Sequence, residues 1–167
     1  PASAAIGRSD ITAVRNKLNA KAAAYVSPKI PFAYDYADGD TNVYSSEPHG
    51  TNMAGIIAGN GELYEGVAPD AQLILMKVFD DNGLSSEADV IAALEDAVIL
   101  GADVINLSLG SGVGAENGYP LDPALAEALD NAAARGVIVN GAAGNNGHIG
   151  LQSDISSKLG LALPSTA

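Results

Sequence analysis

The sequence contains no cysteine and no tryptophan, and only two phenylalanines among its 167 residues. Without cysteine the chain has no disulfide, no thiolate metal site and no cysteine nucleophile. The scarcity of large aromatic rings argues against an aromatic binding platform. It predicts instead a core of Ala, Val, Ile and Leu, as in tightly wound parallel α/β sheets.

Basic residues are also few, with eight Lys and Arg against 20 Asp and Glu and a net charge of -12. Such a chain repels a phosphate backbone, which argues against nucleic acid as a partner. The sequence has no apolar run near the ~20 residues that cross a bilayer, and its start, PASAAIGRSD, lacks the pattern of a signal peptide. We therefore expect no membrane insertion by this segment.

Hydrophobic periodicity and capping residues predict four helices. They are expected at residues 9–24 with Ser9 as N-cap, at 50–59, from Ser86 to Gly101, and from Asp122-Pro123 to Gly136. The helix at 50–59 is apolar nearly all round, so we expect it inside the protein.

Near-continuous apolar runs predict buried strands, and an alternating run predicts a short half-buried one. The buried strands are expected at 73–79, 104–109 and 137–143, and the half-buried one at Phe32, Tyr34 and Tyr36. Strands that alternate with helices predict an α/β fold with three α/β/α layers and a mainly parallel sheet, incomplete as given. Ligands bind such sheets beyond the carboxyl ends of the strands, here the loops at 80–85, 108–114 and 143–147.

His49 immediately precedes the apolar helix, at the positive end of its dipole, where a neutral imidazole can serve as a general base. An isolated His-Gly pair is more often an ordinary surface feature. The wider string HGTNMAGIIAG from His49, followed by Gly66-Val67-Ala68-Pro69, resembles the histidine motif of the subtilisin-like serine proteases. Two further strings follow in family order. VINLSLG at 104–110 is similar to the substrate-binding strand, and AAGN at 142–145 is similar to the oxyanion-hole motif.

The resemblance implies a serine endopeptidase that hydrolyses peptide bonds of extracellular proteins through an acyl-enzyme. It makes His49 the general base and Asn145 the donor to the oxyanion. It also implies that Ser108, Leu109 and Gly110 pair with an extended peptide, and that Ala142, Ala143 and Gly144 line a roomy, uncharged pocket. Taken alone, Asn-Asn-Gly is ordinary turn chemistry, and the small residues suit close strand packing.

A narrower likeness lies outside these motifs. The string KIPFAYDYAD at 29–38, GLQ at 150–152 and LPSTA at 163–167 are similar to the cell-envelope proteinases of Gram-positive bacteria. That subgroup implies a secreted or cell-wall-associated protein with a protein or peptide substrate.

The triad is incomplete in this sequence. No Asp-Thr-Gly or Asp-Ser-Gly precedes His49, and no Gly-Thr-Ser-Met-Ala string follows Asn145. We expect residues 1–167 to be part of a catalytic domain, with the Asp upstream of residue 1, the Ser downstream of residue 167, and the remainder of that domain as a partner. The alternative is a non-catalytic binding or adhesion module descended from a protease. His148 is interpreted as a surface residue.

The sequence also departs from the family pattern at positions that bear on metal and cofactor binding. Position 52 is Asn where the family usually has a second histidine, and the loop at 60–65 is too short for the calcium loop of many subtilisins. No cofactor or metal ligand is assigned. A structural Ca²⁺ elsewhere in the full protein, with Asp35, Asp38 and Asp40 as candidate ligands, is the alternative to a solvated loop. A nucleotide site is excluded because no glycine-rich phosphate loop follows the strands.

Overall fold

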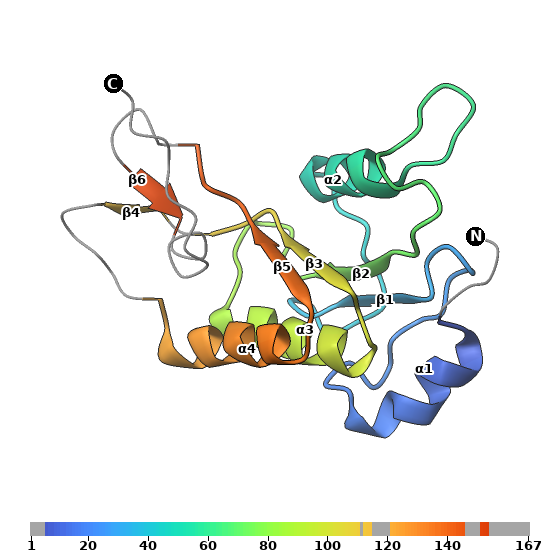
Figure 1. Ribbon diagram of the computed structural model, residues 1–167, viewed down its shortest axis with the longest axis horizontal. Coiled ribbons are helices and arrows are strands. Elements are labelled where there is room, and N and C mark those ends of the chain that lie inside the picture. The colour runs from blue at the N-terminus through green and yellow to red at the C-terminus, as the bar shows by residue number, and fades with distance from the viewer. Residues whose placement is uncertain (1–5, 111, 115–120, 146–150, 154–167) are drawn as a thin grey trace. The chain divides into compact units, whose positions relative to one another are not determined.

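A computed structural model describes residues 6–110, 112–114, 121–145 and 151–153 (Figure 1). The chain forms two units, Pro1–Ala102 and Asp103–Ala167. The predictions for His148, for Gly150 and for residues 163–167 lie outside the described residues.

The first unit is built on two parallel strands. β1 (Phe32–Asp35) pairs with β2 (Ile74–Lys77) in a register that runs from Phe32 opposite Ile74 to Asp35 opposite Lys77. β1 was expected to be half-buried, but Phe32, Ala33 and Asp35 are all at most 1% exposed, so both of its faces are covered. The unit's helical elements are α1 (Arg8–Val14), η1 (Arg15–Lys17), α2 (His49–Ala58) and α3 (Glu87–Ile99).

The helix predicted at residues 9–24 is wrong in both its start and its length. Its N-cap is Gly7 rather than Ser9, because the Asp10 carboxylate accepts a hydrogen bond from the Gly7 amide. The α-helix ends at Val14, and after one 3₁₀ turn the chain becomes extended at Leu18. The reason for the early end lies in a buried carboxylate of α3.

Asp96 of α3 is fully buried and joins three segments of the first unit. Its carboxylate accepts hydrogen bonds from the backbone amides of Asn19 (2.8 Å) and Ala20 (2.9 Å) and from the Tyr36 hydroxyl (2.8 Å). A buried charge is tolerated when donors surround it in this way. Because this carboxylate takes the two backbone amides, the chain leaves the helical path that its periodicity suggests. Burial, and then the hydrogen bond to Asp96, raises the pKa of the Tyr36 hydroxyl.

The predictions for α3 and for α4 (Pro123–Ala134) are confirmed, caps included. The Ser86 hydroxyl accepts a hydrogen bond from the Asp89 amide, and the Asp122 carboxylate accepts one from the Ala124 amide. Such N-caps satisfy amides that have no partner within the helix. Gly136 follows α4 with a φ of 81°, a left-handed conformation that glycine adopts at little cost.

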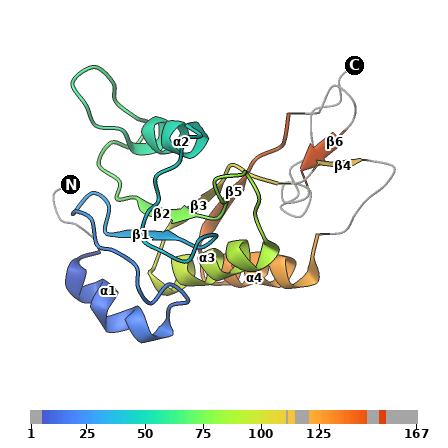
Figure 2. The ribbon, with the colours of Figure 1, turned by 180° about the vertical axis from the view of Figure 1, so that it is seen from behind.

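The second unit contains a second parallel pair. β3 (Val104–Leu107) pairs with β5 (Ile138–Gly141), and α4 lies beside β5 in both views (Figure 1, Figure 2). A short antiparallel pair, β4 (Gly112–Gly114) with β6 (Leu151–Ser153), was not predicted from the sequence, which was interpreted as irregular after Gly150. The pairs β1–β2 and β3–β5 confirm parallel strands in an α/β chain. The joining of the two pairs into one sheet stays a prediction.

We expect Tyr36→Phe to lower the free energy of unfolding by about 1–2 kcal/mol, because the buried Asp96 carboxylate loses one donor while the ring remains. Urea unfolding followed by circular dichroism measures the change. Tyr44→Phe is the matched control, since Tyr44 is 76% exposed and its loss of a hydroxyl should change the value by less than about 0.5 kcal/mol. Equal effects of the two substitutions would contradict the role given to Asp96.

Candidate active site

His49 is the first residue of α2, as the sequence predicts, and its side chain is exposed. Pro48 is the N-cap, and its carbonyl accepts the hydrogen bond from the Asn52 amide that opens the helix. The loop before it, residues 37–48, is largely exposed and polar. An exposed imidazole at the start of a helix is accessible to a reacting group.

The turn Gly66-Val67-Ala68-Pro69 holds the other end of α2. The amides of Gly66, Val67 and Ala68 donate to the carbonyls of Gly59, Ile56 and Ile57 at 2.8, 2.9 and 2.7 Å. Carbonyls at the end of a helix have no partner within it, so this turn satisfies them. The two strings of the histidine motif are therefore one structural unit.

Gly66 is required by close backbone contact at this joint. A Cβ atom there would lie 2.6 Å from the Gly59 nitrogen and 2.7 Å from the Gly55 carbonyl oxygen. Neither backbone atom can move aside as a side chain could. The glycine of the motif therefore allows the turn to reach the helix.

The burial expected for α2 is not observed in the described residues. Ala58 is its one buried residue, and Ile56 is 50% exposed. An apolar helix needs packing partners on every side, and the described residues supply them on the Ala58 side. Val67, in the adjoining turn, is 89% exposed, so the uncovered apolar surface extends beyond the helix.

The predicted substrate-binding residues follow neighbouring strands of the second unit. β3 ends at Leu107 opposite Gly141 of β5, and the Ala142 amide continues the pairing with a 2.9 Å bond to the Leu107 carbonyl. Parallel strands end at the same edge of their sheet. The residues that follow β3, Ser108 to Gly110, and those that follow β5, Ala142 to Gly144, therefore both begin at this edge.

Asn145 comes directly after Gly144, a few residues beyond the end of β5, and is exposed. The preceding Gly144 has a φ of 89°, which turns the chain away from the strand direction. His49 belongs to the first unit and Asn145 to the second. Their convergence on one cleft stays a prediction.

A ladder of side-chain amides across β3 and β5 was missed by sequence reasoning. The side-chain amide of Asn140 donates to the side-chain oxygen of Asn106 at 2.9 Å. The side-chain amide of Asn106 in turn donates to the Ser108 hydroxyl at 2.8 Å. Asn106 and Asn140 are register partners, and Asn106 and Ser108 are two residues apart, so all three lie on one face. The spacing of Asn106 and Ser108 was the signal, but the partner strand's register is not visible in the sequence.

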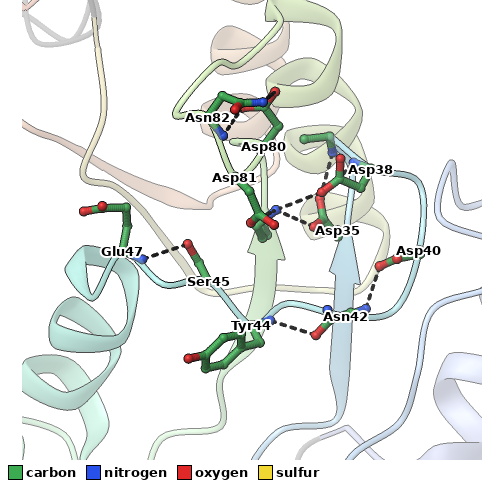
Figure 3. A network of polar contacts seen from close by, with 12 residues as sticks. Asp35, Asp38, Asp40, Asn42, Tyr44, Ser45, Glu47, Asp80, Asp81 and Asn82 are labelled. Atoms are coloured by element: carbon green, nitrogen blue, oxygen red, sulfur yellow. Dashed lines mark hydrogen bonds and ion pairs between the residues drawn. The ribbon is translucent and has the colours of Figure 1, made fainter.

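The acidic residues considered as calcium ligands have other partners. Asp35 and Asp38 both bind the ammonium of Lys77, at 2.6 and 3.2 Å, and the Asp40 carboxylate accepts the Asn42 amide at 2.7 Å (Figure 3). Across the described part of the chain, no group of three or more His, Cys, Asp or Glu residues is arranged to hold a metal ion. Lys77 supplies the positive charge at this place.

Electrostatics keep Lys77 charged. Burial lowers its pKa, but the hydrogen bonds and charges of Asp35 and Asp38 outweigh that effect, so the pKa is raised above the usual value. The neighbouring Asp80 has a lowered pKa, chiefly because its carboxylate accepts the Leu84 amide. Both groups are therefore ionised at neutral pH. Within the described residues, no helix combines the length and apolar character needed to cross a membrane.

Comparison with solved structures supports the class of fold. The chain is similar to the prenylagaramide maturation protease PagA, with a TM-score of 0.54 and 32% identity over 62% of this chain and 36% of that one. The protease domain of PatA gives a TM-score of 0.51 and 31% identity over 57% of this chain and 34% of that domain. These likenesses, with the parallel strands and helices, define an α/β protein of the subtilisin-like class.

The family follows from the sequence comparisons. The Subtilase family model matches residues 16–167, and this chain belongs to that family. It is 40% identical over 143 residues to the PII-type proteinase of Lactococcus lactis subsp. cremoris, and 41% identical over 135 residues to the C5a peptidase of Streptococcus pyogenes serotype M6. These matches cover 78% and 75% of the chain, but 7% and 11% of the two relatives. The predicted resemblance to the subtilisin-like and cell-envelope proteinases is confirmed.

We expect Gly66→Ala to destabilise the protein by about 1–3 kcal/mol, because the new methyl group must displace backbone atoms of α2. Thermal and urea unfolding measure it. Gly50→Ala is the matched control: it lies within α2 with nothing near its Cβ position, so it should stabilise by roughly 0.5–1 kcal/mol. A neutral Gly66→Ala would contradict the close contact described here.

Proposed function

We propose that this chain is part of the catalytic domain of a serine endopeptidase, with His49 as general base and Asn145 as a donor to the oxyanion. The observation that carries the proposal is membership of the Subtilase family over residues 16–167. The location of His49 at the start of α2 and of the other motif residues after β3 and β5 supports these roles. The nucleophilic Ser and the triad Asp would come from the remainder of the domain.

The proposed reaction is peptide-bond hydrolysis in two stages. His49 takes the proton from the serine hydroxyl as its oxygen attacks the carbonyl carbon, and returns that proton to the leaving amine as the acyl-enzyme forms. A water molecule then releases the acyl group with the same base. The Asn145 amide donates a hydrogen bond to the negative oxygen of each tetrahedral intermediate.

Substrate recognition would use the shared edge of β3 and β5. An extended peptide can add a strand along the backbone of Ser108, Leu109 and Gly110. The wall formed by Ala142, Ala143 and Gly144 carries no charge and little volume, which suits bulky or varied side chains before the scissile bond. The names of the relatives, a proteinase and a peptidase, agree with a protein or peptide substrate.

A place at the cell envelope or in the surrounding medium follows from the same relationship. The resemblance of residues 29–38 to the cell-envelope proteinases of Gram-positive bacteria supports a substrate met outside the cell. The net charge of -12 agrees with a soluble surface that does not attract nucleic acid. The location and the remainder of the catalytic domain are part of this proposal.

We expect His49→Ala in the complete protein to abolish covalent labelling by a fluorophosphonate, because the serine then has no base to activate it. Labelling is measured by mass spectrometry of the intact polypeptide. His148→Ala, which removes the only other histidine of the chain, is the matched control and should leave labelling in place.

The labelling experiment separates the enzyme from a non-catalytic module. A binding or adhesion protein derived from a protease would give no covalent adduct with or without His49. Labelling that persists in His49→Ala would exclude the histidine as the base. Either result contradicts the proposal.

We expect Asn145→Ala to lower kcat by ~10²–10³ with little change in KM, because the amide acts on the transition state. That magnitude comes from a subtilisin and is carried over through the family relationship. Steady-state hydrolysis of a peptide substrate by the complete protein measures it. Asn131→Ala on the exposed side of α4 is the control, and a loss of equal size there would contradict the assignment.

A further inference from the structure

The segment that carries His49 leaves the first unit's sheet and returns to it. The chain departs from β1 at Asp35, passes through the loop at 36–48 and through α2, and re-enters the sheet in β2, which ends at Lys77. Asp35 and Lys77 are register partners, so the residue at which the excursion begins lies beside the end of β2. A contact between these two residues fixes the point at which the chain leaves β1.

An ion pair joins the ends of β1 and β2. The Lys77 ammonium lies 2.6 Å from an Asp35 oxygen, 3.2 Å from Asp38 and 3.8 Å from Asp81 (Figure 3). The side chains of Lys77 and Asp35 are 11% and 2% exposed, so water screens this pair little. Removing the lysine would leave a buried carboxylate without its counter-charge, which is strongly unfavourable.

The same carboxylate also shapes the start of the loop. The second Asp35 oxygen accepts the amides of Ala37 and Asp38 at 3.0 and 3.1 Å, and the Asp35 amide donates to the Asp40 carbonyl at 2.9 Å. Lys77 binds Asp38 within this turn as well. The ammonium therefore ties a closed turn, rather than a single side chain, to the end of β2.

From this turn to His49 the loop is held by bonds between near neighbours. The Asn42 amide donates to the Asp40 carboxylate, the Tyr44 amide to the Asn42 side chain, and the Glu47 amide to the Ser45 hydroxyl (Figure 3). The far end of α2 is fixed by the turn that begins at Gly66. These bonds run from the turn that Lys77 anchors to Glu47, two residues before His49.

We propose that Lys77 is a positioning residue for His49, acting through its contacts with Asp35 and Asp38. The inference rests on the proposed function for the role of the histidine. An error of about 1 Å in the placement of a catalytic group can cost ~10²-fold in rate. Release of the anchor should therefore slow the chemical step and leave substrate binding largely intact.

The test is Lys77→Met in the complete protein, which keeps the stem of the side chain and removes the charge. We expect kcat for a peptide substrate to fall about tenfold to a hundredfold, with KM changed by less than about threefold. Amide hydrogen exchange in residues 36–48 should become at least about tenfold faster. Lys77→Arg should restore most of both, because a guanidinium binds two carboxylates at once. Lys21→Met, at an exposed position, is the matched control and should change neither.

A second variant covers the case in which Lys77→Met fails to fold. Combining Lys77→Met with Asp35→Asn leaves no unpaired buried charge at this place, and the carbonyl oxygen of the introduced carboxamide can still accept the two turn amides. This double variant should fold by circular dichroism, yet retain the fast exchange and the low kcat. Unchanged exchange, or faster exchange with unchanged kcat, overturns the inference. A parent protein with no fluorophosphonate labelling would instead overturn the proposed function, so the two failures are distinguishable.

Discussion

Parallel pairing obliges both strands of a pair to end at the same edge, however long the connection between them. In the second unit it sets the residues after Leu107 beside those after Gly141, where the substrate-binding residues of the motif lie. In the first unit it sets Asp35, where the segment that carries His49 leaves β1, beside Lys77. The chemistry proposed for this subtilase chain depends on that constraint in both units.

Elements defined by local signals could be predicted from the sequence. α3 and α4 have the expected N-caps, because an N-cap and a helical period act between near neighbours. The helix predicted at 9–24 ends at Val14, because the Asp96 carboxylate, far along the chain, binds the amides of Asn19 and Ala20. The pair β4–β6 was missed because a strand of three residues is too short to show a detectable period.

In the candidate site, too, features set by local sequence could be predicted and features set by distant contacts could not. The motif strings placed His49 at the start of α2 and Asn145 after β5, since each string is continuous in the sequence. The Lys77 cluster and the hydrogen bond from Asn140 to Asn106 were not predicted, because their partners meet through strand register alone. The acidic residues left a choice between a solvated loop and calcium, and the structure places the Lys77 ammonium against two of them, Asp35 and Asp38. The expected burial of α2 is observed only at Ala58, and Ile56 is half exposed in the described structure.

The proposed function has one geometric requirement, which is that the side chains of His49 and Asn145 face the same active site. A crystal structure of the complete protein with a peptidyl phosphonate bound covalently to its serine measures it directly. The account predicts the His49 ring within hydrogen-bond distance of the serine oxygen, and the Asn145 amide within such a distance of the phosphonyl oxygen. Side chains of His49 and Asn145 that face separate surfaces in that complex would contradict it.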